Sequence, residues 1–135
     1  MNVDLAALFP ALSKLPAMLA DDVSRQAKQM NAPAGAVLFD AGTACQALPL
    51  VLSGTIKVSK RAENGREIRL YGVQPGELCI VTVSCLLGGD PYPATGVAET
   101  AVSAIALPRP LFMKLAAEYP PFRDIVFSLF SERLT

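Results

Sequence analysis

The residues that could carry chemistry in this sequence are few, and histidine is absent from all 135 positions. Most serine and cysteine hydrolases use histidine as their general base, and most catalytic zinc and non-haem iron sites use it as a ligand. A metal-dependent enzyme on a β-roll of the cupin type would also need a histidine and carboxylate cluster. The sequence therefore predicts a protein that is not an enzyme and that has no metal site.

Three cysteines, Cys45, Cys79 and Cys85, are the other reactive candidates. They are too few for a four-cysteine iron–sulfur cluster, and an odd number is typical of reduced thiols in the cytosol. Cys79 and Cys85 lie six residues apart, which places them about 120° out of phase on a helix but on one face of a strand. Two interpretations stay open for this pair: small buried apolar residues, or thiols that sense redox state or nitric oxide.

The charge of the chain bears on its partners. Twelve basic and twelve acidic side chains give a net charge of zero, whereas a domain that binds DNA itself usually carries a basic surplus. This segment is therefore not expected to be the nucleic-acid contact. No apolar stretch approaches the roughly 18–20 residues that span a bilayer, and the first residues lack the basic region of a signal peptide. We expect a cytoplasmic protein without membrane association.

Residues 1–33 are predicted to form helices. An apolar stripe at helical spacing is formed by Leu5, Leu8, Phe9 and Leu12. Pro10 interrupts this stripe, so two short helical pieces are expected in place of one long helix. A further helix is predicted from Ala17 to about Met30.

Residues 34–108 have the pattern of a β-roll. Glycines punctuate short apolar runs about every ten residues, which is typical of a sandwich or barrel of seven or eight short strands. The clearest hairpin has Asn64-Gly65 at its centre, a dipeptide that favours a type I′ turn. The alternating apolar residues of its two arms are Ile56, Val58, Ile68 and Leu70. A short helical insert is expected around Leu78–Leu87.

Residues 109–135 return to helical spacing, with Pro120-Pro121 at a break that suits a helix start. The apolar stripe after this break consists of Phe122, Ile125, Val126, Leu129 and Phe130. The pattern still runs at Thr135 without a glycine cap. We therefore expect a truncated helix whose stripe forms the seam of a homodimer. The whole chain, residues 1–135, is predicted to be a single domain.

Three segments in a fixed order resemble a known family; they are Gly35–Gly42, Leu50–Val58 and Pro75–Leu78. They are similar to the sensor domain of the Crp/Fnr family of bacterial transcription regulators, over nearly the whole chain. The resemblance implies a mainly β fold with flanking helices, a double-stranded β-helix of the jelly-roll, cyclic-nucleotide-binding-domain type. It also implies a C-terminal dimerisation helix followed by a helix-turn-helix domain. That last domain is absent from this chain, so DNA would be bound only through it.

In nucleotide-binding members of this family, the pocket opens with Gly-Glu and closes with an arginine that pairs with the cyclic phosphate. The opening is present here as Gly76-Glu77, but Tyr92 stands at the place of the arginine and Pro93 removes a backbone donor. A buried phosphate without its cation is costly, so a cyclic nucleotide is disfavoured. Arg66 and Arg69 stay open as substitutes. The candidate pocket residues are Gly76, Glu77, Leu78, Cys79, Tyr92, Pro93, Ala94 and Thr95.

The predicted function is effector sensing for a dimeric transcription regulator, with the signal passed through the last helix to the missing DNA-binding domain. The effector is a small molecule of unknown identity or a redox or nitric oxide signal, and the cofactor is likewise unknown. The alternative is a stand-alone cyclic-nucleotide-binding regulatory module. A helix-turn-helix in the natural gene downstream of Thr135 would separate the two.

Overall fold

The computed structural model describes residues 3–134, and the side chains of residues 5–131. The chain begins with helix α1 (Val3–Leu8), a 3₁₀ helix η1 (Pro10–Leu12) and helix α2 (Ala17–Gln26). Pro10 is the first residue of η1, because proline has no N–H to donate inside a helix but fits its first turn. The predicted division into two short helical pieces is confirmed.

The prediction that the next helix continues to about Met30 is wrong. Helix α2 ends at Gln26, and Ala27 already has the extended angles φ −72° and ψ 140°. Strand β1 (Lys28–Ala32) follows and pairs antiparallel with β7 (Val102–Pro108), with Lys28 opposite Ala106. The β-roll therefore begins near residue 28, because pairing with a distant strand satisfies these backbone groups outside the helix.

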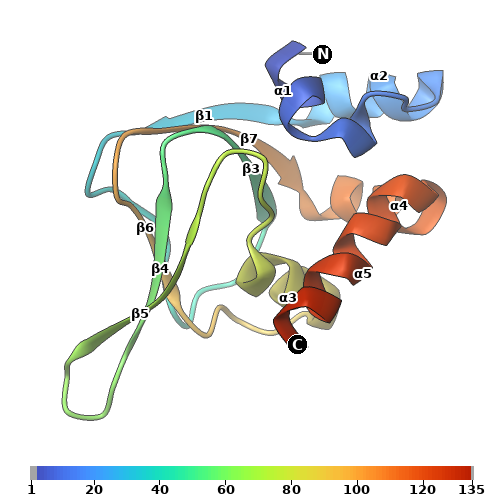
Figure 1. The fold of residues 1–135 in the computed structure, drawn as a ribbon. Coiled ribbons are helices and arrows are strands. Elements are labelled where there is room, and N and C mark those ends of the chain that lie inside the picture. The colour runs from blue at the N-terminus through green and yellow to red at the C-terminus, as the bar shows by residue number, and fades with distance from the viewer. Residues whose placement is uncertain (1–2, 135) are drawn as a thin grey trace.

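Two antiparallel sheets make up the roll (Figure 1). One has the strand order β1-β7-β3 and the other the order β2-β6-β4-β5. The remaining strands are β2 (Val37–Phe39), β3 (Ala47–Ser53), β4 (Ile56–Arg61), β5 (Glu67–Val73) and β6 (Thr95–Ala98). The described residues thus form seven strands, within the number that the glycine spacing predicts.

The hairpin of β4 and β5 forms as predicted, but its turn is not type I′. Gly65 has φ 82°, and no described residue other than glycine has positive φ, whereas a type I′ turn needs two such residues. The loop instead closes with the Ala62 N–H donating to the Arg66 carbonyl at 2.8 Å. The arms extend beyond the rest of the roll (Figure 1), so Ile68 is 48% exposed.

Three helices complete the fold: α3 (Ile80–Gly88), α4 (Arg109–Glu118) and α5 (Pro120–Leu134). Helix α3 confirms the predicted insert. The Tyr71 hydroxyl accepts from the Val81 N–H at 3.1 Å near its start, and Gly89 caps its end with φ 76°. The start of α5 at Pro120 also agrees with the prediction. No helix among the described residues has the length and apolar character needed to cross a bilayer.

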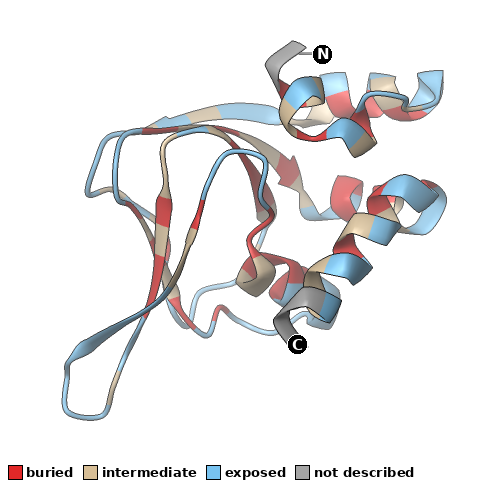
Figure 2. Cartoon of the chain, in the orientation of Figure 1, coloured by how far each residue is buried: buried red, intermediate tan, exposed pale blue. Residues whose placement is uncertain are grey.

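The buried side chains form two clusters; Figure 2 colours the buried residues red along the chain. One lies among the helices and strand β3; its Phe112 and Phe122 rings pack edge to face with centroids 5.7 Å apart. The other lies between the sheets, inside the roll. Helix α2 is also joined to α4 by an ion pair, with Lys114 Nζ 2.6 Å from Asp22 Oδ2.

Candidate functional site

The predicted pocket residues do not form one site, because Leu78 and Cys79 belong to different clusters. Leu78 packs in the cluster among the helices, whereas Cys79 is buried in the cluster inside the roll. The backbone at Cys79 is extended, with φ −80° and ψ 106°, and consecutive side chains of an extended segment point to opposite faces. The segment after Gly76 therefore separates a cavity beside α5 from the interior of the roll.

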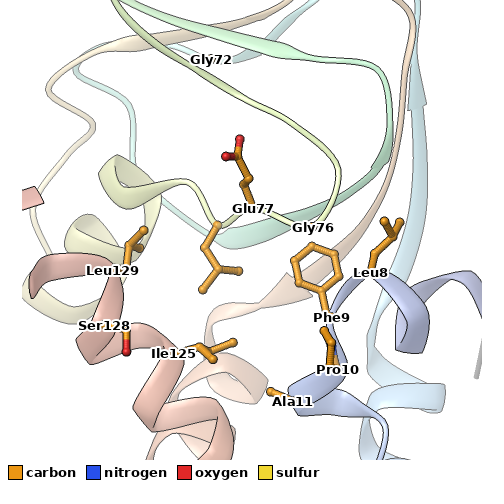
Figure 3. A pocket seen from close by; sticks show the side chains of 11 residues that line it. Leu8, Phe9, Pro10, Ala11, Gly72, Gly76, Glu77, Ile125, Ser128 and Leu129 are labelled. Carbon is orange, nitrogen blue, oxygen red and sulfur yellow. The ribbon is translucent and has the colours of Figure 1, made fainter. Parts of the chain in front are cut away.

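The cavity beside α5 has a volume of about 310 Å³. Its walls come from the end of α1 with η1, from the β5–α3 loop with Gly72, and from α5 (Figure 3). The residues that line it are Leu8, Phe9, Pro10, Ala11, Gly72, Gly76, Glu77, Leu78, Ile125, Ser128 and Leu129. Most of these are apolar, so the cavity suits a small molecule with a largely apolar body.

The Gly76-Glu77 pair stands at the edge of this cavity. Gly76 has φ 84°, and a Cβ there would lie 3.1 Å from the Leu8 carbonyl oxygen, so the close approach of the two segments requires glycine. The exposed Glu77 accepts from the Gln74 backbone N–H at 2.8 Å through Oε1. This contact holds the carboxylate at the rim, where Figure 3 shows it directed toward Gly72.

Tyr92, which replaces the expected arginine, fills the roll. It is 6% exposed, and its ring stacks on Phe39 with centroids 4.2 Å apart and an interplanar angle of 14°. The Cys45 thiol donates to the Tyr92 hydroxyl, with 3.2 Å between Sγ and Oη. A Cβ on Gly96 would lie 2.3 Å from the Phe39 ring, so this glycine makes room for the stack. Burial raises the pKa of Tyr92, and the hydroxyl therefore stays neutral at physiological pH.

The other residues of the segment that was expected to close a nucleotide pocket offer no phosphate site. Pro93 is exposed and Ala94 is buried. Thr95 is engaged elsewhere: its hydroxyl donates to Asp40 Oδ1 at 3.0 Å and accepts from the Ala41 N–H at 3.2 Å. None of these side chains supplies the charge-assisted bonds that a cyclic phosphate needs.

The hairpin arginines do not substitute for the missing one. Arg69 is paired with Glu99 through Nη1 and Oε2, and Arg66 is an exposed residue at the distal loop of the hairpin. Neither lines the cavity beside α5. The structure therefore does not fit a cyclic nucleotide bound in the manner of the nucleotide-binding members.

Comparison with known proteins agrees with this architecture. The family model described as the cyclic nucleotide-binding domain matches residues 29–119. The chain belongs to this family. The domain is 28% identical over 118 residues to the "CRP-like cAMP-activated global transcriptional regulator" of Mycobacterium tuberculosis, covering 83% of the chain and 49% of that protein. The chain thus spans about half the length of the curated relative it matches.

Two solved structures show the same fold. The sensor domain of the transcriptional regulator DNR from Pseudomonas aeruginosa has a TM-score of 0.78 at 19% identity, over 97% of this chain and 86% of that one. The Catabolite Activator Protein of Thermus thermophilus has a TM-score of 0.75 at 27% identity, over 93% and 58%. The Crp/Fnr resemblance and the jelly-roll fold predicted from the sequence are therefore confirmed.

The last helix of this cyclic nucleotide-binding domain corrects the predicted dimer seam. Phe122 and Val126 are 0% and 2% exposed in the single chain, so they belong to its own core and cannot form the seam. Ile125 and Leu129 are half-buried and line the cavity. Phe130 is half-buried, and the neighbouring Phe127, which the sequence prediction omitted, is 63% exposed. Within residues 120–131, Phe127 therefore lies on the exposed face of α5.

The cysteines of the domain are all free thiols, and the two predicted sensors are buried. Burial raises the pKa of Cys85 to about 11; it also raises the pKa of Cys45. Oxidants react with an accessible thiolate, so the raised pKa disfavours a redox role for Cys85 and burial alone disfavours one for Cys79; the redox hypothesis stays a prediction. Sequence spacing did not single out Cys45, although it lines a pocket of about 300 Å³ together with Cys85 and Arg109.

The described residues contain no cluster of three or more His, Cys, Asp or Glu suited to a metal ion.

Proposed function

We propose that the chain is the effector-sensing domain of a Crp/Fnr-type transcription regulator, and that it senses a small molecule in the cavity beside α5. The observation that carries this proposal is that Ile125 and Leu129 of α5 share one cavity with Gly76, Glu77 and Leu78 of the β5–α3 loop. A molecule bound there contacts the roll and the last helix at the same time.

Ligand binding is coupled to the position of α5 because the helix forms part of the cavity wall. An effector that favours one position of α5 shifts the population of helix arrangements by its difference in affinity for them. In the full regulator, this helix leads toward the DNA-binding part, and pairing of two copies places the exposed Phe127 face of α5 at the seam. The neutral net charge of the chain supports a role in sensing and not in DNA binding, because a domain that binds DNA usually carries a basic surplus.

The alternative, a stand-alone module regulated by a cyclic nucleotide, is favoured by the family match over residues 29–119. Calorimetric titration of the domain with cyclic AMP and cyclic GMP distinguishes the two. We expect no saturable binding of either nucleotide at micromolar concentration, because Tyr92 occupies the roll and its hydroxyl is neutral. Micromolar binding of either nucleotide would overturn the proposal in favour of the alternative.

A further inference from the structure

We infer that Cys45 and Cys85 form a dithiol site for a thiophilic molecule that bridges two sulfur atoms, of the chemical class of the trivalent arsenicals. The site lies in the pocket between residues 42–45, the end of α3 and the start of α4, and it is separate from the cavity beside α5. Two thiols line this one pocket, and their contacts place them close together.

The pocket has the size of a small-molecule site. Its volume is about 300 Å³, at the lower end of the roughly 300–1,000 Å³ that such sites span. Cys45 and Cys85 are the two thiols among its described lining residues, and Cys79 is not one of them. Cys45 is half-buried whereas Cys85 is 4% exposed, so Cys45 is the more accessible sulfur of the pair.

Two observations place the sulfurs close together. Cys45 Sγ lies 3.7 Å from the carbonyl oxygen of Thr82 in α3, and Cys85 lies three residues later in the same helix. Residues three apart on a helix are neighbours on one face. The two thiols also interact electrostatically, because burial first and then the charge of Cys45 raise the pKa of Cys85. A molecule in the pocket can therefore reach both sulfurs.

The protonation of the two thiols favours an arsenical over an oxidant. Burial raises the pKa of both Cys45 and Cys85, so both are neutral at physiological pH, whereas oxidation requires a thiolate. An arsenical of the form R–As=O condenses with two neutral thiols. Arsenic forms one bond to each sulfur, its bond to oxygen breaks, and the oxygen leaves as water with the two thiol protons. Arsenic stays trivalent, so the step needs no oxidant or reductant.

A dithiol also suits an arsenical better than a metal ion. Structural zinc takes four ligands, whereas the part of the chain that the structure describes has no group of three or more residues suited to a metal ion. Trivalent arsenic that carries an organic group needs only two sulfurs, since that group holds its third position. The volume of the pocket leaves room for a small organic group.

Titration with phenylarsine oxide tests the site. The reduced 135-residue chain is titrated under native conditions, and native mass spectrometry counts the adducts. We expect one adduct per chain, with a mass gain of one phenylarsenic group less two protons. The adduct should survive excess 2-mercaptoethanol and be removed by 1,2-ethanedithiol, because the second thiol of the chain acts at a high effective concentration that a free monothiol does not match.

Three single variants assign the sulfurs. Cys45→Ala and Cys85→Ala should each weaken binding of phenylarsine oxide by roughly 100-fold, because attachment through one sulfur remains. Cys79→Ala removes a buried thiol outside the pocket and is the matched control, which should keep the adduct. Melting followed by circular dichroism shows that each variant is folded. Should Cys85→Ala fail to fold, Cys45→Ala, at the half-buried position, decides the assignment.

Each other outcome would overturn the inference. An adduct that a folded Cys45→Ala or Cys85→Ala variant keeps at full affinity would show that the two sulfurs are not bridged. Loss of the adduct in a folded Cys79→Ala variant would place the bridge on another pair. An adduct that forms only in urea, where any two cysteines can meet, would show that the folded pocket does not present both thiols, and so would the absence of any adduct.

Discussion

Replacing Tyr92 with alanine is expected to destabilise the domain strongly, because its ring occupies the interior of the roll. The side chain is 6% exposed, and removing a buried aromatic ring typically costs about 3–5 kcal/mol in the free energy of unfolding. Against a usual total of about 5–15 kcal/mol, this loss is large. Tyr92→Phe keeps the ring and removes the hydroxyl, which accepts from the Cys45 thiol, so it should cost much less, about 1–2 kcal/mol.

The stacking of Tyr92 on Phe39 contributes an interaction energy that can be measured separately from the total loss of stability. With centroids 4.2 Å apart, the two rings should show a coupling energy of about 0.5–1.5 kcal/mol in a double-mutant cycle of Tyr92→Leu and Phe39→Leu. Urea unfolding followed by far-ultraviolet circular dichroism measures all four proteins, since the chain contains no tryptophan to serve as a fluorescent probe.

The result bears directly on function. If Tyr92 were a movable lid over a nucleotide site, Tyr92→Ala would cost little and would open the roll to cyclic AMP. We expect the reverse, a large loss of stability without a gain of nucleotide binding, because the variant still lacks a cation for the phosphate. A destabilisation below about 1 kcal/mol, far under the range for a buried ring, would refute the packing role assigned to Tyr92.

Three further predictions concern other parts of the chain. The hydrogen bond from Lys114 lowers the pKa of Asp22 from its ordinary 3.8. The ionised Asp22 therefore contributes its full share to the free energy of unfolding above pH 3.8, and this contribution is lost as the pH falls through the lowered pKa. Asp22→Asn should make the free energy of unfolding fall less steeply at acid pH, and an unchanged dependence on pH would contradict this prediction. With a pKa of about 11, Cys85 should react with a disulfide reagent at pH 7.5 more than about 100-fold more slowly than an unperturbed thiol, and rapid labelling of the native protein would revive the redox hypothesis. Phe127→Glu should weaken self-association in analytical ultracentrifugation without lowering the melting temperature, since this ring is 63% exposed; a dimer insensitive to the change would move the seam elsewhere.

The sequence by itself determined the features that depend on neighbours along the chain. Pro10 and Pro120 mark helix starts, and the alternation around residues 64–65 indicates a hairpin, because proline geometry and strand alternation act over a few residues. The ordered motifs were sufficient to identify the fold. Even the poor fit to a nucleotide was visible in the sequence, from the tyrosine at position 92.

The tertiary structure alone decided which faces meet. Residues 28–32 form a strand because β7 lies beside them, although their local pattern continues a helix. Gly76 and Tyr92 were expected in one pocket, yet they lie on the two sides of a segment whose side chains alternate. Phe122 is buried because α5 packs on its own domain. Such outcomes depend on contacts between residues far apart in sequence, and no local periodicity encodes which partner a given apolar face will find.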